Sequence, residues 1–243
     1  MRDQHFMIDK DLLVRIVGLA DLNKEDTVLE IGGGAGALTE YILKIAKEVY
    51  VIEKDKRYIQ VLDEKFSHHK KVMFLMGNAM EMEFPKFNKC VSNLPYTICE
   101  PLLWKMTRYD YDLLVFVVPA KFVKLLTGQK ESRLKFLIDA FYELEVLDDV
   151  PPEAFDPPPR IYSKVIRLRP KKGNLFLREF LSQYDKKTKN ALRQILVKSG
   201  MNKRDASEKV ALSIRPLLQS RKVCNLSLVE IKEVIKNFLE SKA

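Results

Sequence analysis

The sequence predicts an α/β fold with a mostly parallel sheet, followed by a small helical domain. Three observations support this. Short apolar runs alternate with segments of helical periodicity over the first 118 residues, which is typical of crossover units between parallel strands. Two further strand candidates follow, and from residue 175 onward the pattern is helical throughout. The expected strands are residues 27–31, 49–52, 72–76, 89–92, 113–118, 141–147 and 163–168.

Helices are expected where apolar residues recur every three or four positions. One such segment precedes the first strand, three fall between the strands, and three fall near the C-terminus. The last is preceded by Ser227, with Glu230 three residues later, a pattern typical of a capping box at a helix N-terminus. The expected helices are residues 12–19, 37–46, 57–66, 102–106, 175–184, 187–198 and 227–239.

The chain is expected to form two domains. Five prolines between residues 150 and 160 are incompatible with a helix or a central strand, so this segment is predicted to be a rigid loop. The domain boundary is placed at Lys171-Lys172-Gly173. Residues 1–172 would form the α/β domain, and residues 173–243 a small basic all-α domain.

The net charge of +9 is distributed unevenly along the chain. Residues 174–243 hold 15 Lys and Arg against 7 Asp and Glu, whereas the preceding residues hold 27 against 26. A basic end on a near-neutral body indicates contact with a polyanion such as nucleic acid. The alternative is a solvated lysine-rich face.

Other features argue against membrane and metal functions. No apolar run approaches the roughly 18 residues of a membrane span, and the N-terminus has no apolar signal core. The cysteines Cys90, Cys99 and Cys224 lack the spacing of metal ligands. We therefore expect a cytoplasmic protein with free thiols, no metal and no membrane partner, and a monomer is the simplest expectation.

A glycine-rich turn after the first strand indicates a nucleotide-containing cofactor. Gly32, Gly34 and Gly36 follow Glu30, at the sheet edge where ligands of parallel α/β folds bind. Glu53, 21 residues after Gly32, can accept ribose hydroxyls, which also suits a dinucleotide. The glycine spacing, and a turn at Asn78 that can bind an adenine amine, favour S-adenosylmethionine over a nicotinamide or flavin cofactor.

The fourth strand ends in Asn93-Leu94-Pro95-Tyr96, residues suited to activating an adenine amine. That amine is a poor nucleophile because its lone pair is delocalised into the ring. The Asn93 amide oxygen and the Leu94 carbonyl can each accept one N–H and favour the nucleophilic form in the transition state. Pro95 stiffens the turn, and Tyr96 offers a face for a flipped-out base. A simple Asn-Pro turn that caps a strand is the alternative.

Together these motifs resemble the KsgA family of ribosomal RNA adenine dimethyltransferases, which are related to the Erm methyltransferases. Six segments carry the resemblance in order along nearly the whole chain: residues 4–9, 28–39, 51–55, 93–96, 150–163 and 186–192. The resemblance implies a Rossmann-like class I methyltransferase fold with a seven-stranded sheet and a small C-terminal helical domain.

The resemblance also implies roles for individual residues. His5 and Met7 would lie against the methionine end of S-adenosylmethionine, and Gly32 and Gly34 would belong to its binding loop. Glu53 would bind the ribose, Asn78 the cofactor adenine, and Asn93 both the cofactor and the target base. Tyr96 and Phe155 would sandwich the target adenine. These roles concern His5, Met7, Gly32, Gly34, Glu53, Asn78, Asn93, Tyr96 and Phe155.

The function implied is transfer of methyl groups to N6 of two adjacent adenosines in a hairpin near the 3′ end of 16S rRNA, which would aid 30S biogenesis. The partner would be small-subunit rRNA in a pre-30S particle. Asn78 stands where the family usually has Asp, and residues 119–134 depart from its pattern. A non-catalytic assembly factor, an Erm-like 23S rRNA enzyme and a DNA adenine methyltransferase are therefore alternatives.

Overall fold

A computed structural model describes residues 5–171 and 175–240 of the chain. The fold divides into two compact units, each considered by itself. The first contains residues up to 103, 109–128 and 142–171; the second contains residues 104–108, 129–141 and 172 onward. Lys172 and Gly173, where the sequence places the domain boundary, lie outside the described residues.

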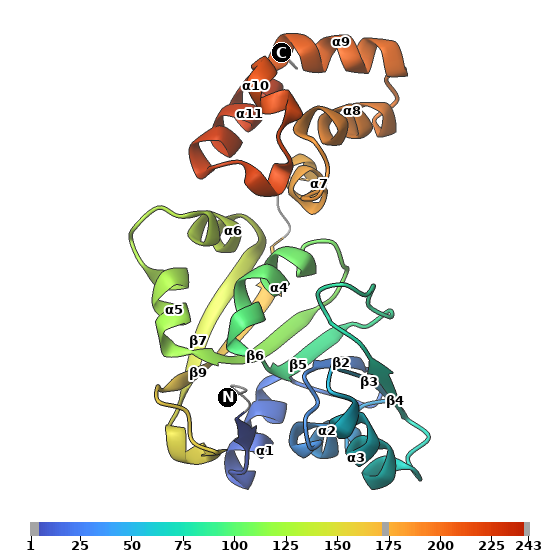
Figure 1. Ribbon diagram of the computed structural model, residues 1–243, viewed down its shortest axis with the longest axis vertical. Coiled ribbons are helices and arrows are strands. Elements are labelled where there is room, and N and C mark those ends of the chain that lie inside the picture. Colours follow the sequence, from blue (N-terminus) through green and yellow to red (C-terminus); the bar gives the residue numbers. More distant parts are fainter. Residues whose placement is uncertain (1–4, 172–174, 241–243) are drawn as a thin grey trace. The chain divides into compact units, whose positions relative to one another are not determined.

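The first unit is built on a seven-stranded sheet with the strand order β4-β3-β2-β5-β6-β9-β7 (Figure 1). The first five of these strands are parallel, whereas β9 is antiparallel to both β6 and β7. All seven expected strands are present: β2 Thr27–Ile31, β3 Glu48–Glu53, β4 Val72–Met76, β5 Lys89–Asn93, β6 Leu113–Pro119, β7 Tyr142–Val150 and β9 Ser163–Pro170. The predicted α/β fold is confirmed.

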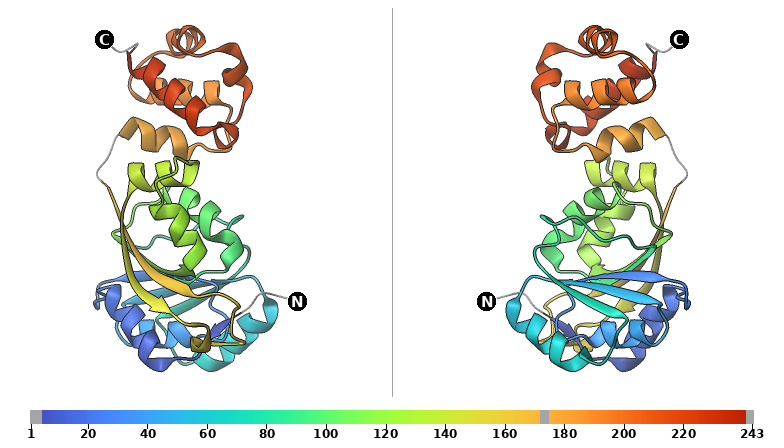
Figure 2. Two further views of the ribbon diagram at one scale, coloured as in Figure 1. Left: turned by 90° about the vertical axis from the view of Figure 1, so that its left-hand side faces the viewer. Right: turned by 90° about the vertical axis from the view of Figure 1, so that its right-hand side faces the viewer.

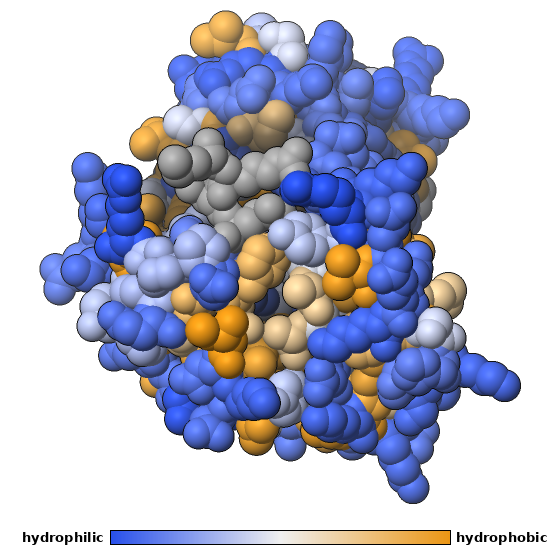
Figure 3. Space-filling view, turned by 60° about the horizontal axis from the view of Figure 1, so that its bottom comes forward, coloured by the Kyte–Doolittle hydropathy of each residue, from blue (hydrophilic) through white to orange (hydrophobic). Residues whose placement is uncertain are grey.

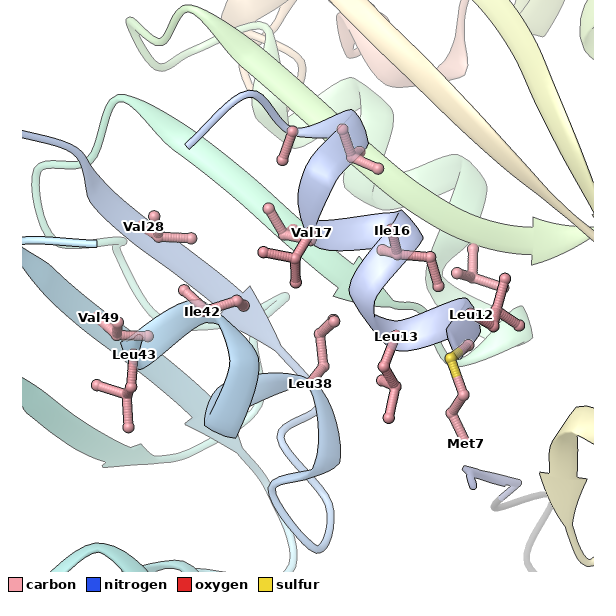
Figure 4. Packing of buried hydrophobic residues seen from close by; sticks show 14 of the residues in the cluster. Met7, Leu12, Leu13, Ile16, Val17, Val28, Leu38, Ile42, Leu43 and Val49 are labelled. Atoms are coloured by element: carbon pink, nitrogen blue, oxygen red, sulfur yellow. The ribbon is translucent and has the colours of Figure 1, made fainter. Parts of the chain in front are cut away.

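Helices cover both faces of this sheet (Figures 1 and 2). On one face lie α1 Lys10–Leu19, α2 Ala37–Leu43 and α3 Lys56–Phe66, and on the other lie α5 Ala120–Thr127 and the first turns of α4 Cys99–Met106. Figure 4 shows Leu13 and Val17 of α1 and Leu38 and Ile42 of α2 gathered with Val28 of β2. Burial on both faces explains why β6 is apolar throughout.

The proline-rich segment is more regular than the sequence predicts. A 3₁₀ turn spans Pro152–Ala154, and β8 Phe155–Asp156 pairs with β1 Phe6–Met7 in a small antiparallel sheet. Proline is tolerated in the first turn of a helix, where its missing N–H is not needed. Phe155 and Asp156 keep their N–H groups, so they can pair with the N-terminal segment. The segment between residues 150 and 160 contains no α-helix and no strand of the seven-stranded sheet, as expected, but its 3₁₀ turn and two-residue strand were not predicted.

The second unit is helical, as expected. Its helices are α6 Arg133–Phe141, α7 Leu175–Ser182, α8 Thr188–Lys198, α9 Lys203–Ser213, α10 Pro216–Ser220 and α11 Leu228–Glu240, of which the sequence predicted α7, α8 and α11. The capping box is confirmed: the Ser227 N–H donates to Glu230 Oε2 at 2.7 Å, and the Glu230 N–H to Ser227 Oγ at 3.3 Å. None of the described helices is both long and apolar enough to span a bilayer.

Candidate functional site

A cavity of about 1000 Å³ lies at the carboxyl ends of β2, β3, β4 and β5. Five segments that are distant in the sequence line it: residues 5–8, the glycine-rich turn, the end of β3, residues 77–79 and residues 93–98. Figure 3 shows a hollow with apolar side chains gathered around it. The structure thus brings together ten of the eleven site residues singled out from the sequence: His5, Met7, Gly32, Gly34, Glu53, Asn78, Asn93, Leu94, Pro95 and Tyr96.

The glycine-rich turn lies directly beside the Asn93-Leu94-Pro95-Tyr96 segment, because β2 and β5 are neighbours in the sheet. A Cβ atom on Gly32 would lie 3.5 Å from Pro95 Cδ and 3.8 Å from the Asn93 carbonyl oxygen. Gly34 has φ +52°, and a Cβ atom there would lie 2.9 Å from the Phe6 ring. This backbone can therefore approach a ligand closely, but only as glycine.

Glu53 is held rigidly at the end of β3. Its Oε2 accepts the Gly34 N–H at 3.0 Å, and its Oε1 accepts the Lys54 and Asp55 N–H groups at 2.8 and 2.9 Å. An ionised carboxylate has about four acceptor positions, of which these bonds use three. The remaining position on Oε2 suits one ribose hydroxyl, so binding a second would require one backbone bond to give way.

Glu30 is a second carboxyl group at the cavity, and its role was not predicted from the sequence. It is 2% exposed and accepts the Thr39 hydroxyl at 2.6 Å. Burial is the main cause that raises its pKa to about 8; the Thr39 hydrogen bond acts in the opposite direction, and the nearby Glu53 charge makes a smaller upward contribution. Glu30 is therefore mostly protonated at neutral pH. An acid at the end of an apolar strand, with a hydroxyl residue on the next helix, was the available sequence signal.

Asn78 follows β4 and lies in an Asx-type turn at the cavity. Its Oδ1 accepts the Met80 N–H at 3.0 Å, and its Nδ2 donates to Glu81 Oε1 at 2.6 Å. Asn78 and Glu81 are both exposed in the structure. The side-chain amide is therefore oriented by one partner at each end.

The Asn93 amide is oriented by the N-terminal segment. Its Nδ2 donates to the His5 carbonyl at 3.2 Å, and none of the described residues donates to its Oδ1. His5 itself is tied to the proline-rich segment, because its Nδ1 lies 2.7 Å from the Pro157 carbonyl. Fixing Nδ2 in this way presents Oδ1 as a hydrogen-bond acceptor.

The neighbouring groups complete an acceptor pair and an aromatic face. The Leu94 N–H donates to the Val117 carbonyl at 3.2 Å, whereas no described residue donates to the Leu94 carbonyl. The Tyr96 hydroxyl lies 2.7 Å from Ser163 Oγ, and Ser163 is fully buried on β9. Burial raises the Tyr96 pKa, so its ring is a neutral face. Ser163, 67 residues from Tyr96, could not be found from the sequence.

Phe155 is the one sequence-derived site residue that does not line the cavity. It is 2% exposed, packs in the core of the first unit and pairs with Met7 across the small sheet. The ring that the structure places near Tyr96 is that of His5, at a centroid distance of 6.2 Å. Phe155 is therefore buried away from the cavity lining in this structure, and the sandwich of a base between Tyr96 and Phe155 stays a prediction.

The donor set of the cavity fits a nucleoside cofactor. Glu53 provides a carboxylate at the end of β3, and Asn78 provides an amide oxygen just after β4. The closely packed glycine turn follows β2. Such groups bind a ribose, an adenine amine and a flexible chain laid along backbone. The described residues contain no group of His, Cys, Asp and Glu that could hold a metal ion.

The fold is that of the Rossmann-like class I methyltransferases. Residues 2–230 match the profile of the family described as ribosomal RNA adenine dimethylase, and the chain belongs to this family. Membership confirms the family that the motifs resemble, and with it the expected enzyme class and the S-adenosylmethionine cofactor.

Individual relatives agree with this assignment. The chain is 32% identical over 251 residues to a probable ribosomal RNA small subunit methyltransferase A of Methanosarcina barkeri, covering 99% of this chain and 88% of that protein. The crystal structure of a dimethyladenosine transferase from Plasmodium falciparum has the same fold, with a TM-score of 0.69 and 22% identity, covering 98% of each chain. The 23S rRNA methyltransferase ErmE also shares it, with a TM-score of 0.63 and 21% identity, covering 98% of this chain and 100% of that one.

Proposed function

We propose that this protein transfers methyl groups from S-adenosylmethionine to N6 of adenosines in small-subunit 16S rRNA. The sites would be two adjacent adenosines, dimethylated, in a hairpin near the 3′ end, and the substrate would be a pre-30S particle in the cytoplasm. The observation that carries the proposal is the hydrogen bonding of Asn93, which lines the cavity: its Nδ2 donates to the His5 carbonyl, and its Oδ1 is left as an acceptor.

The chemistry follows from the acceptors at the end of β5. Asn93 Oδ1 would accept one N–H of the target amine, and the Leu94 carbonyl would accept the other. Both bonds strengthen as the amine nitrogen pyramidalises, so they stabilise the transition state more than the ground state. S-adenosylmethionine would supply an electrophilic methyl group on a sulfonium: the N–C bond would form as the S–C bond breaks, S-adenosylhomocysteine would leave, and one amine proton would pass to solvent. No metal is required of the protein.

Other residues would bind and position the two substrates. Glu53 would hold the cofactor ribose, Asn78 would face its adenine, and Gly32 and Gly34 would let its methionine part lie against the turn. His5 and Met7 would line the methionine end. These assignments are supported by their common cavity, in which Met7 is 5% exposed and Glu53 6%.

The target base would stack on Tyr96, whose ring is fixed through its hydroxyl bond to Ser163. Stacking on one aromatic face stabilises a flipped-out base by roughly 1–3 kcal/mol. We propose that Phe155 supports this pocket through its pairing with Met7, and that it contacts the base only if the small β1–β8 sheet moves.

The proposal is tested with labelled S-adenosylmethionine and four acceptors: immature small subunits, large subunits, naked rRNA and duplex DNA. Label is expected in the small subunit alone or most strongly. Label chiefly in the large subunit would instead favour an Erm-like enzyme, and label in DNA a DNA methyltransferase. No incorporation into any acceptor, together with no calorimetric binding of S-adenosylmethionine, would favour a non-catalytic assembly factor.

A further inference from the structure

Asn78 and Glu81, which follow β4, are joined by a side-chain hydrogen bond. To bind the amine of a nucleobase, the side chain that follows β4 must accept a hydrogen bond. An aspartate at this position would accept it with a full negative charge. This chain has the neutral Asn78 at that position. An amide presents either an oxygen or an NH₂ group, depending on which way it is turned. Only one of the two orientations can accept an amine N–H.

Two contacts decide the orientation of the Asn78 amide. The Met80 N–H donates to Oδ1 at 3.0 Å, and Nδ2 donates to Glu81 Oε1 at 2.6 Å. Turning the amide over would set its NH₂ group against the Met80 N–H and its oxygen against the Glu81 carboxylate. Both contacts would then be repulsive, so Oδ1 stays at the position that accepts.

Glu81 also affects the strength of this acceptor. The bond from Asn78 Nδ2 to a carboxylate is charge-assisted and polarises the amide toward a more negative oxygen. A carbonyl oxygen has two lone pairs, and the Met80 N–H occupies one of them. The second lone pair of Oδ1 remains for a ligand, and Asn78 lines the cavity.

We infer that Glu81 is a positioning residue that makes the neutral Asn78 act as a cofactor-adenine acceptor, so that the pair does the work of a single aspartate. This inference rests on the proposed function, because it assigns the adenine end of the same cofactor site. The pair would select a 6-amino purine and reject a 6-oxo purine, whose carbonyl oxygen would face Asn78 Oδ1.

The test measures binding rather than turnover. Calorimetry compares S-adenosylhomocysteine with its deaminated analogue, S-inosylhomocysteine, for the full-length wild type and a set of variants. The wild type is expected to prefer the adenosine compound. Glu81→Ala should weaken adenosine binding roughly three- to tenfold, the range of one hydrogen bond, and reduce the preference by a similar factor. Glu81→Gln, which keeps an acceptor but no charge, should fall between the two.

The decisive comparison uses an aspartate substituted for Asn78. Asn78→Asp alone places two carboxylates together and should weaken binding, whereas Asn78→Asp combined with Glu81→Ala should restore it to within about threefold of wild type. Removing Glu81 is thus harmful in the wild-type background and beneficial in the Asn78→Asp background. A role for Glu81 only in holding the loop would give the same sign in both backgrounds. Glu64→Ala, which removes an exposed acid on α3, is the matched control and should bind as the wild type does.

The outcomes separate the two proposals. If the wild type binds S-adenosylhomocysteine but Glu81→Ala binds both compounds as well as the wild type does, the role of Glu81 is wrong and the proposed function stands. If Glu81→Ala weakens binding in both backgrounds, Glu81 is a loop support and the inference is again overturned. If the wild type binds neither compound, the proposed function fails, and this inference fails with it.

Discussion

Asn93 shows how one side chain acquires a chemical role from a distant segment. Its amide belongs to the end of β5, but the group that turns it is the carbonyl of His5, 88 residues earlier in the chain. The sequence could predict an acceptor at position 93 from the residue type and the following Pro95. It could not predict that Nδ2 is bound by His5 and Oδ1 is left as an acceptor, because that depends on where the N-terminal segment lies.

Replacing Asn93 should therefore abolish turnover and leave the fold intact. Loss of one transition-state acceptor typically lowers kcat by about 10²–10³-fold, and Asn93→Ala is expected to lose at least that much. Asn93→Asp should also be poor, because a carboxylate cannot donate to the His5 carbonyl and would be repelled by it. Single-turnover methyl transfer measures the effect, with thermal unfolding as the control. An Asn93→Ala variant with normal kcat would remove the assigned role.

Glu30 predicts a pH dependence of stability. Its pKa is about 8 in the folded protein against an ordinary value of 4.5, so the folded state binds the proton more tightly than the unfolded state. The stability that this proton contributes is complete below about pH 4.5 and is lost as the pH rises to about 8.

Glu30→Gln should remove this dependence, because glutamine stays neutral. Between about pH 5 and 8.5 the wild type should lose more unfolding free energy than the variant, by on the order of 4 kcal/mol. Urea unfolding across this range measures the difference, and Glu64→Gln on the surface is the control. Parallel stability curves for wild type and Glu30→Gln would show that the buried carboxyl carries no raised pKa.

Among the elements, the strands were predicted from sequence more accurately than the helices. Apolar runs bounded by polar residues predicted β2 and β4 to the residue. Helix α9 was missed because its eleven residues bury only Ala206 and Val210, too few for a visible period. Helix α10 was missed because it begins at Pro216, and in the sequence a proline at the first position of a short helix looks the same as a proline in a turn. The burial of Phe155 depends on tertiary packing, so its motif alone could not show that its ring packs in the core instead of lining the cavity.

The turn between β2 and α2 should tolerate no side chain at Gly34. Gly34→Ala places a side chain at φ +52° and 2.9 Å from the Phe6 ring, which should destabilise the fold by about 1–2 kcal/mol and weaken cofactor binding. Gly18 provides the matched control, because it lies in α1 with no atom within 4 Å of an added Cβ. Gly18→Ala should stabilise by about 0.5–1 kcal/mol. Thermal unfolding and calorimetry of both variants measure these effects, and equal effects would show that the turn tolerates a side chain.

Over the full chain, the excess positive charge and the cavity belong to different parts of the sequence. The cavity lies in the near-neutral α/β unit, whereas residues 174–243 carry most of the excess positive charge. Lys189 and Arg193 are exposed one helical turn apart on α8, which supports a role for this helix in contacting phosphates.

Binding to small-subunit rRNA should accordingly weaken steeply with salt. If Lys189 and Arg193 each contact one phosphate, Lys189→Gln and Arg193→Gln should each reduce the slope of log K against log[salt] by about 1. Lys198→Gln is the control, because Lys198 is paired with Glu179 at 2.8 Å. Filter binding at several salt concentrations measures the slopes. Unchanged slopes would show that α8 is merely a solvated face.

The proposed mechanism depends on one cavity that presents an adenine amine, held by Asn93 and Leu94, to a methyl donor bound along the glycine turn. Mass mapping of nucleosides after reaction of wild type and Asn93→Ala with immature small subunits tests it most directly. We predict N6,N6-dimethyladenosine at adjacent positions near the 3′ end of the rRNA with wild type, and unmodified adenosine at those positions with the variant. Methylation at a ring nitrogen or a ribose, or the same dimethyladenosine with both proteins, would contradict it.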